Sequence, residues 1–271
     1  MSPLRALLAL AAIGAAPVAA QTGRPAPAVL TVFAAASLTD AFEELGALFQ
    51  RGHPGITVRF NFAGSQQLAA QLEHGASADV FASADQRWMA EVQRQGLSAG
   101  EPVIFAHNRL VVVLPAENPA RIERLEDLAH PGLKLVLAAD AVPAGRYSRE
   151  VLRNLSRRPS FGWDYERRVL ANVVSEEENV KGVVAKVQLG EADAGVVYRS
   201  DVTPGIAAKL RVLDIPAAAN IVASYSIVAL AASGAPDAAR AFVELVRGAE
   251  GRATLARHGL MPPPPPPPGA P

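Results

Sequence analysis

Short apolar runs of strand length alternate with stretches of helical periodicity along most of this chain, and this alternation constrains the fold more than any other feature. Residues 29–36 form an apolar, partly β-branched run of strand length. Residues 38–50 follow with Phe42 and Leu45 at helical spacing. Strands that alternate with helices pair in parallel, and the crossover helices cover both faces of the sheet. The pattern therefore predicts an α/β protein.

The same alternation continues to the end of the chain. Further strands are predicted at residues 56–62, 78–83, 103–114, 133–138, 194–198, 210–215 and 221–230. Further helices are predicted at residues 66–73, 86–95, 125–128, 147–155, 180–189, 236–248 and 251–258. No segment repeats with a period of about 20 to 50 residues, which argues against a solenoid or propeller. A chain of 271 residues, half of them hydrophobic, is long enough for two α/β lobes.

The first twenty residues have the features of an export signal. Arg5 precedes an apolar run that begins at Ala6 and ends in small residues at Ala20. The run is shorter than the roughly 20 residues that a membrane-spanning helix needs. We therefore expect residues 1–20 to be a signal peptide cleaved near Ala20, which leaves a soluble, exported protein. The alternative is a buried N-terminal helix, which fits the charge order and the cleavage site less well.

The last ten residues, 262–271, are dominated by an unbroken run of prolines from Pro262 to Pro268. Such a run can form neither helix nor sheet, so we expect a disordered, extended and solvated tail outside the lobes. Recruitment of a partner module is an alternative role for it.

Charge and composition exclude several classes of function. The chain has 26 basic and 26 acidic side chains and no basic cluster, so we expect neither nucleic acid nor an acidic membrane surface as a partner. It has no cysteine, which excludes disulfides, a thiolate nucleophile and a lipid-attached N-terminal cysteine. The five histidines are scattered without metal-ligand spacing, and we expect no bound metal cation and no cofactor.

Four predicted helix starts carry small or hydroxyl residues. Ser37 stands at the expected N-cap of the first helix, and Ser65 opens the second after a glycine. Residues 143–145 form a third turn and residues 178–180 a fourth. Each turn alone is only a cap. Several helix N-termini that converge would, however, form a site for a small anion without lysine or arginine.

The acidic run at residues 176–178 lies just ahead of the predicted helix at 180–189. It could suggest a cation site, but complementing the dipole of that helix is the simpler interpretation.

Six segments of the chain follow one another in a distinctive order. They are VFAAASLTDAF (32–42), ADVFASADQRWM (78–89), VPAG (142–145), ENVKG (178–182), GVVYRSD (195–201) and RHGL (257–260). In register, these segments resemble one family, the periplasmic molybdate-binding proteins of ABC importers. The resemblance covers roughly residues 29–261.

The resemblance implies a type II periplasmic-binding-protein fold. Each of its two lobes would be a mixed, mainly parallel sheet flanked by helices. Lobe I would comprise residues 27–109 and 218–261, and lobe II residues 110–217. Two crossings, at residues 111–115 and 214–223, would form the hinge on which the lobes close.

The resemblance also implies a ligand site in the cleft between the lobes. Ser37 and Ser65 would each supply a hydroxyl and a backbone N–H, Ala144 and Val180 backbone N–H groups, and Tyr198 its phenolic hydroxyl. Gly64 stands where some family members have another serine. The implied function is capture of molybdate and tungstate and delivery to the permease of an inner-membrane ABC importer, by a monomeric periplasmic protein that is not an enzyme.

The chemistry of such a site agrees with this function and leaves two alternatives. A fully deprotonated dianion only accepts hydrogen bonds, whereas a protonated phosphate also needs an acceptor for its own proton. None of these five residues offers a carboxylate as that acceptor. Sulfate differs in size alone, so an exported binding protein for sulfate, thiosulfate or an organic acid is one alternative. The other is an exported serine hydrolase that uses Ser65, although the Gly-x-Ser-x-Gly elbow is missing.

Overall fold

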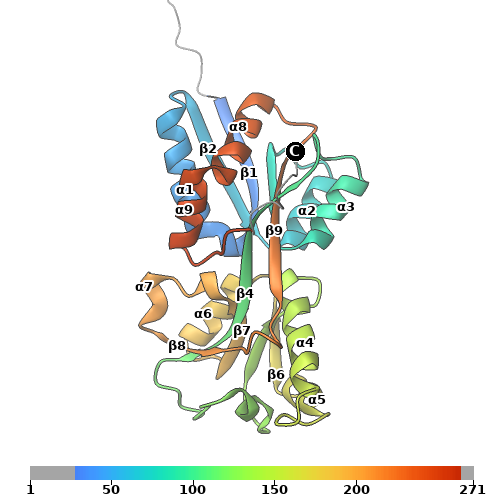
Figure 1. Cartoon of the computed structure of the whole chain (residues 1–271), viewed down its shortest axis with the longest axis vertical. Coiled ribbons are helices and arrows are strands. Elements are labelled where there is room, and N and C mark those ends of the chain that lie inside the picture. The colour runs from blue at the N-terminus through green and yellow to red at the C-terminus, as the bar shows by residue number, and fades with distance from the viewer. Residues whose placement is uncertain (1–27, 264–271) are drawn as a thin grey trace, which may run out of the picture.

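A computed structural model describes residues 28–263 of the chain. The expected signal peptide and residues 264–271 of the tail lie outside the described residues. A single curled sheet of nine strands forms the centre of the molecule, and helices pack on both of its faces (Figure 1). The strands are β1 (Ala28–Ala35), β2 (Ile56–Ala63), β3 (Val80–Ser83), β4 (Val103–Pro115), β5 (Leu135–Ala138), β6 (Val173–Glu177), β7 (Ala194–Tyr198), β8 (Leu210–Asp214) and β9 (Val222–Ala229).

The helices connect the strands and cover the sheet. The α-helices are α1 (Thr39–Gly52), α2 (Ser65–Glu73), α3 (Gln86–Arg94), α4 (Pro143–Ser156), α5 (Tyr165–Leu170), α6 (Val180–Gln188), α7 (Pro204–Ala207), α8 (Pro236–Arg247) and α9 (Ala249–Arg257). Three short 3₁₀ turns are η1 (Ala36–Leu38), η2 (Leu125–Ala129) and η3 (Arg199–Asp201).

Strand β4 divides the sheet into two halves because it changes partners along its length. Its first part pairs with β9 as far as Arg109, and its second part pairs with β7 and β8 from Leu110 onward. The first half-sheet has the order β2-β1-β3-β9-β4, and the second half-sheet has the order β4-β7-β5-β6 with β8 also on β4. In Figure 1 these halves lie above and below one another, and residues 215–221 make the second connection between them.

The strand pairing is mixed, which confirms the predicted α/β class. Strand β1 pairs in parallel with β2 and β3, and β5 pairs in parallel with β6 and β7. Every pair that involves β4 or β9 is antiparallel. Strands β1, β2 and β3 therefore run in one direction in the first half, and β5, β6 and β7 run in one direction in the second half.

Each half-sheet has its own helical layers. Helices α1, α8 and α9 pack on one face of the first half-sheet, where Phe42, Phe49 and Phe242 form an aromatic cluster. Helices α2 and α3 pack together on the other face. Helices α4 and α6 both contact β5 and β7 of the second half-sheet.

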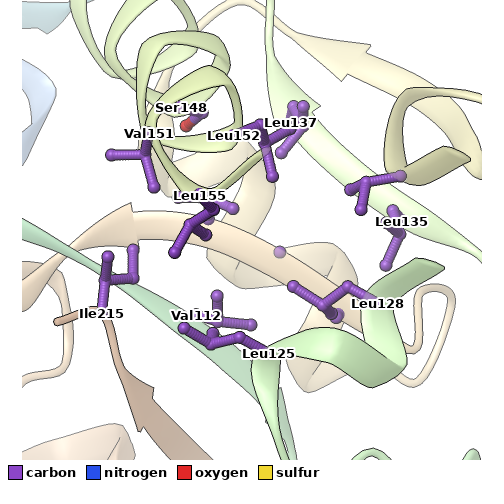
Figure 2. A pocket seen from close by; sticks show the side chains of 14 residues that line it. Val112, Leu125, Leu128, Leu135, Leu137, Ser148, Val151, Leu152, Leu155 and Ile215 are labelled. Carbon is purple, nitrogen blue, oxygen red and sulfur yellow. The ribbon is translucent and has the colours of Figure 1, made fainter. Parts of the chain in front are cut away.

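A small apolar cavity lies in the core of the second half. Figure 2 shows that leucine and valine side chains of η2, α4, β4 and β5 surround it. Its single hydroxyl belongs to Ser148, which donates to the backbone oxygen of Ala144 at 2.6 Å. The one hydroxyl proton of the lining is therefore already used, and no side-chain donor is left for a polar ligand.

Among the α-helices and strands, α5, β6 and α7 have no counterpart in the sequence pattern, and the 3₁₀ turns η1 and η3 have none either. Strand β6 includes Glu176 and Glu177, so two of the three consecutive acids are strand residues rather than a segment ahead of a helix. Glu177 pairs with Lys186 at 2.7 Å and Glu176 pairs with Arg149. These pairings give the acids structural partners within the second half.

Within residues 28–263, every helix falls short of the length and apolar character that a bilayer crossing requires.

Candidate functional site

A small cavity lies between the two halves, where three helices and η1 begin. About 210 Å³ of space, which includes some space open to solvent, lies between its lining atoms. All five residues that the resemblance pointed to line it. The lining is Ala35, Ala36, Ser37, Ala63, Gly64, Ser65, Ala84, Val142, Pro143, Ala144, Asn179, Val180 and Tyr198.

Ser37 lies inside η1 and does not have the N-cap position expected from the sequence. The N-cap residue of η1 is Ala35 and that of α1 is Leu38. A 3₁₀ turn therefore separates β1 from α1 and frees the Ser37 side chain from the capping role. Its hydroxyl lies 2.9 Å from the hydroxyl of Tyr225 on β9.

Ser65 is the first residue of α2, with Gly64 as N-cap, as the sequence indicates. Its side-chain oxygen accepts a hydrogen bond of 3.0 Å from the backbone N–H of Ala84. That bond uses a lone pair and leaves the hydroxyl proton of Ser65 available. Because Ser65 is almost fully buried, the proton can only be donated inside the cavity.

Ala144 and Val180 belong to the first turns of α4 and α6. Helix α4 begins at Pro143 and not near Tyr147 as the sequence pattern predicted, because proline is well suited to a first helical position. Asn179 caps α6 by accepting from the N–H of Gly182 at 3.2 Å. First-turn N–H groups have no carbonyl partner in their own helix, so these amides are available to an anion.

The hydroxyl of Tyr198 is buried without a partner. Tyr198 ends β7, is 1% exposed, and its hydroxyl makes no hydrogen bond within residues 28–263. Burial, followed by the nearby Tyr225 hydroxyl, raises the pKa of Tyr198 well above its ordinary value, so it is a neutral donor. A buried polar atom without a hydrogen bond costs about 1 to 3 kcal/mol, so this hydroxyl is suited to donate to a ligand in the cavity that Tyr198 lines.

Two further residues next to the site have no signal in the sequence. Asn108 on β4 and Tyr225 on β9 are completely buried, and the Asn108 side-chain NH₂ lies 3.4 Å from the Tyr225 hydroxyl. Both occur in ordinary strand patterns, where a tyrosine or asparagine has no distinguishing spacing. Only the pairing of β4 with β9 brings them beneath Ser37.

Direct contacts join the two halves around the cavity. Arg146 of α4 contacts the buried carboxylate of Asp85 at 3.1 Å, and the indole N–H of Trp88 donates to Ala141 at 2.9 Å. Lys181 of α6 pairs with Asp40 of α1 at 2.7 Å. The side-chain amides of Gln66 and Gln67 both donate to Glu178. The structure therefore has the halves closed over the cavity.

The cavity contains donors but no charged side chain. Its lining residues include no lysine, no arginine and no carboxylate side chain. Within residues 28–263 no cluster of acidic and histidine side chains could hold a metal ion. The histidines contact other groups, such as Ser224 for His107 and Glu44 for His258, and in the described part of the chain none bonds to Ser65.

These features define a class of protein. Two α/β halves, joined by crossing segments and closed over a cavity of helix N-termini, are the architecture of a type II periplasmic binding protein. The chain belongs to the bacterial extracellular solute-binding proteins, whose family model matches residues 30–261. This is a family of transport binding proteins, not of enzymes. Membership in it argues against the alternative that Ser65 is the nucleophile of a hydrolase.

Known relatives agree with this family. The chain is 43% identical over 230 residues to the molybdate-binding protein ModA of Mycobacterium tuberculosis H37Rv, an alignment that covers 85% of this chain and 83% of that protein. Its fold matches the periplasmic molybdate-binding protein of Azotobacter vinelandii with a TM-score of 0.73 at 22% identity, over 86% of this chain and 99% of that one.

A sulfate-binding protein has the same fold. SubI from Mycobacterium tuberculosis H37Rv matches with a TM-score of 0.78 at 16% identity, over 88% of each chain. At such identities the two structural matches show the fold alone.

Proposed function

We propose that this protein captures molybdate, and tungstate with it, in the cavity between its two halves and delivers it to the permease of an ABC importer. The observation that carries the proposal is the unpartnered, buried hydroxyl of Tyr198. It adjoins a cavity that the hydroxyls of Ser37 and Ser65 and the first turns of α4 and α6 also line. The 43% identity to a protein named for molybdate binding supports the choice of anion.

The donor set suits an oxyanion that has no proton. Molybdate and tungstate are tetrahedral dianions at neutral pH, and all of their oxygens accept hydrogen bonds. The cavity offers hydroxyl protons and backbone N–H groups, and helix N-termini supply partial positive charge without a cation. Each hydrogen bond to a charged group contributes about 1.5 to 3 kcal/mol, so a few such bonds support tight binding.

Closure of the halves would complete the site. We assign residues 27–109 and 218–261 to lobe I and residues 110–217 to lobe II, because β4 changes partners between Arg109 and Leu110. Ser37 and Ser65 belong to the first lobe, whereas Ala144, Val180 and Tyr198 belong to the second. An anion that bonds to both sets stabilises the closed form, because only that form engages all the donors.

The family of extracellular solute-binding proteins supports an exported protein. We propose that residues 1–20 are removed after Ala20 and that the mature protein acts as a monomer in the periplasm. Mass spectrometry of the protein purified from the periplasm tests the cleavage, and an N-terminus at Gln21 is expected.

Titration calorimetry of the mature protein tests the anion. Molybdate and tungstate should bind tightly at neutral pH, whereas sulfate, being smaller, should bind much more weakly. Hydrogen phosphate carries a proton and should also bind weakly. Sulfate that binds as tightly as molybdate would support the alternative of a sulfate binder, whose fold this chain shares.

Single substitutions test the placement of the site. Ser37→Ala and Ser65→Ala should each weaken molybdate binding by about 1 kcal/mol or more, because each removes one hydroxyl bond to a charged group. Thermal unfolding without ligand should show that both variants remain folded. Unchanged titrations for both variants would mean that the anion binds elsewhere.

A further inference from the structure

The hydroxyl of Ser37 ends a buried chain of hydrogen bonds that begins between the two halves. The Tyr225 hydroxyl lies 2.9 Å from the Ser37 oxygen, and the side-chain NH₂ of Asn108 lies 3.4 Å from the Tyr225 oxygen. The same NH₂ donates to Ser200 of η3 at 2.8 Å. All four side chains are buried, with at most 6% of their surface exposed. Bulk water therefore cannot substitute for a member of the chain.

The orientation of the Asn108 amide is fixed by the backbone. Its side-chain oxygen accepts a hydrogen bond of 2.9 Å from the N–H of Arg109. A flipped amide would place its NH₂ against that N–H, donor against donor. The Asn108 NH₂ must therefore face Tyr225 and Ser200 as a donor.

This orientation sets the direction of the whole chain. The Tyr225 oxygen accepts from Asn108, so its own proton must go elsewhere. Among the described residues, Ser37 supplies the one acceptor within hydrogen-bond distance of that proton. The Ser37 oxygen therefore accepts from Tyr225, and the Ser37 proton remains free for the cavity.

We propose that Asn108 and Tyr225 are positioning residues that keep Ser37 as a hydrogen-bond donor and thereby favour a proton-free oxyanion over a protonated one. The inference rests on the proposed function and adds to it the residues that determine selectivity. Ser65 needs no such residue, because a backbone N–H, that of Ala84, already occupies its oxygen. A change of the Asn108 side chain can thus turn the Ser37 hydroxyl from a donor into an acceptor toward the ligand.

The variant Asn108→Asp tests this direction with almost no change of shape. The carboxylate can still accept from Arg109, but its other oxygen accepts a proton from Tyr225 where the amide donated one. Tyr225 then no longer donates to Ser37, and Ser37 turns its proton toward Tyr225 and its lone pairs toward the ligand. The affinity for molybdate should fall at least tenfold relative to the affinity for hydrogen phosphate.

The two ligands are compared at a pH of about 8, where inorganic phosphate is mainly the singly protonated dianion. Both ligands then carry two negative charges, so repulsion by the new carboxylate acts on both and cancels in the ratio. Phosphate affinity is measured by competition against molybdate on the full mature chain. Tyr225→Phe provides a second, uncharged variant and should lower the same ratio by a smaller factor.

A double-mutant cycle separates this role from a merely structural one. In a Ser37→Ala background, Asn108→Asp should leave the molybdate-to-phosphate ratio unchanged, because the hydroxyl that it reorients is gone. Equal losses for both anions in Asn108→Asp, or a ratio change that persists without Ser37, would overturn the inference while wild-type binding still supports the proposed function. A wild-type chain that binds no molybdate would instead contradict the proposed function itself.

Discussion

Tyr198 and Asp201 are three residues apart, and both place a polar atom in the interior without a partner. The Tyr198 hydroxyl and one carboxylate oxygen of Asp201 lack hydrogen bonds within the described part of the chain. The other Asp201 oxygen accepts from the Tyr198 N–H at 2.9 Å. The same tight turn thus holds a donor for the cavity and a carboxyl group that burial makes difficult to ionise.

The variant Tyr198→Phe should separate binding from stability. We expect molybdate affinity to fall about tenfold or more, because one hydrogen bond to a charged ligand is lost. The free energy of unfolding without ligand should be unchanged or higher, since the hydroxyl bonds to no protein group in the described structure. Calorimetry and urea denaturation measure the two quantities. Unaltered affinity would remove Tyr198 from the site.

Asp201 should make stability depend on pH near neutrality. Burial raises the pKa of Asp201 to about 7, from an ordinary 3.8; nearby Lys181 lowers it, and Asp40 raises it. Between these values the folded chain holds a proton that the unfolded chain releases, so the contribution of Asp201 is full below the lower value and declines as pH rises to about 7. The slope is at most about 1.4 kcal/mol per pH unit.

Asp201→Asn provides the comparison for this pH effect. Urea denaturation should show the variant gaining stability relative to the wild type between pH 5 and about pH 7, where the folded wild type still holds the proton that the unfolded chain has released. The paired carboxylates of Asp40 and Glu177, whose pKa values are lowered, change stability only in more acidic solution. A constant difference between the two proteins across that window would be evidence against a raised pKa.

At the scale of elements, the sequence predicted the alternation of strands and helices but not every boundary that shapes the site. Apolar residues at helical spacing indicate α1, α2 and α6 in the sequence, and Ser65 and Asn179 occupy the expected helix starts. The start of α4 at Pro143 was missed, because its first turn contains alanine and glycine with no apolar period. Strand β6 was missed because it is short and acidic.

The site itself was predictable only as far as local motifs extend. Ser37, Ser65, Ala144, Val180 and Tyr198 belong to recognisable segments and line one cavity. Asn108 and Tyr225 depend on the long-range pairing of β4 with β9, which no local pattern encodes. The contacts that join the two halves also depend on long-range structure that no local pattern encodes. Two of their residues, Asp85 and Trp88, nevertheless belong to the recognisable segment 78–89.

The start of α2 should tolerate no side chain at Gly64 when the halves are closed. A Cβ atom there would lie 2.5 Å from the backbone oxygen of Glu178 in the opposite half. Gly64→Ala should therefore weaken molybdate binding by about tenfold, as overpacking costs about 1 to 3 kcal/mol. The open form should be unaffected, so thermal stability without ligand should change little.

Gly52→Ala is a matched control for this substitution, because a Cβ atom at Gly52 meets nothing within 4 Å. Calorimetry on both variants decides the matter. Equal affinities for the two variants would show that the halves close less tightly around Gly64 than the structure shows.

At the scale of the whole molecule, the polar contacts around the cavity decide how readily the halves close. Asp85 is completely buried, and Arg146 reaches its carboxylate from the opposite half. Such a pair contributes to closure chiefly because breaking it leaves a buried charge without a partner. The contact of Lys181 with Asp40 and that of Trp88 with Ala141 also join the halves, but they are more exposed and should contribute less.

Arg146→Gln should therefore lower molybdate affinity about tenfold, although Arg146 is outside the cavity lining. Arg153→Gln is the control, because Arg153 lies on the same helix and pairs with Glu166 within the second half. Small-angle scattering should show the wild type and the control compacting at lower molybdate concentration than Arg146→Gln. Identical titrations for the two variants would be inconsistent with a closing role.

The sheet order also determines when each half can fold during synthesis. Strand β9 lies between β3 and β4, so the first half-sheet lacks a central strand until residues 222–229 have been made. Until then β3 presents an unpaired edge, and half-built sheets with such edges are prone to aggregate. The chain must therefore be nearly complete before its first half is stable, a delay that keeps this half of a nascent chain unfolded and suits a protein that crosses a membrane before folding.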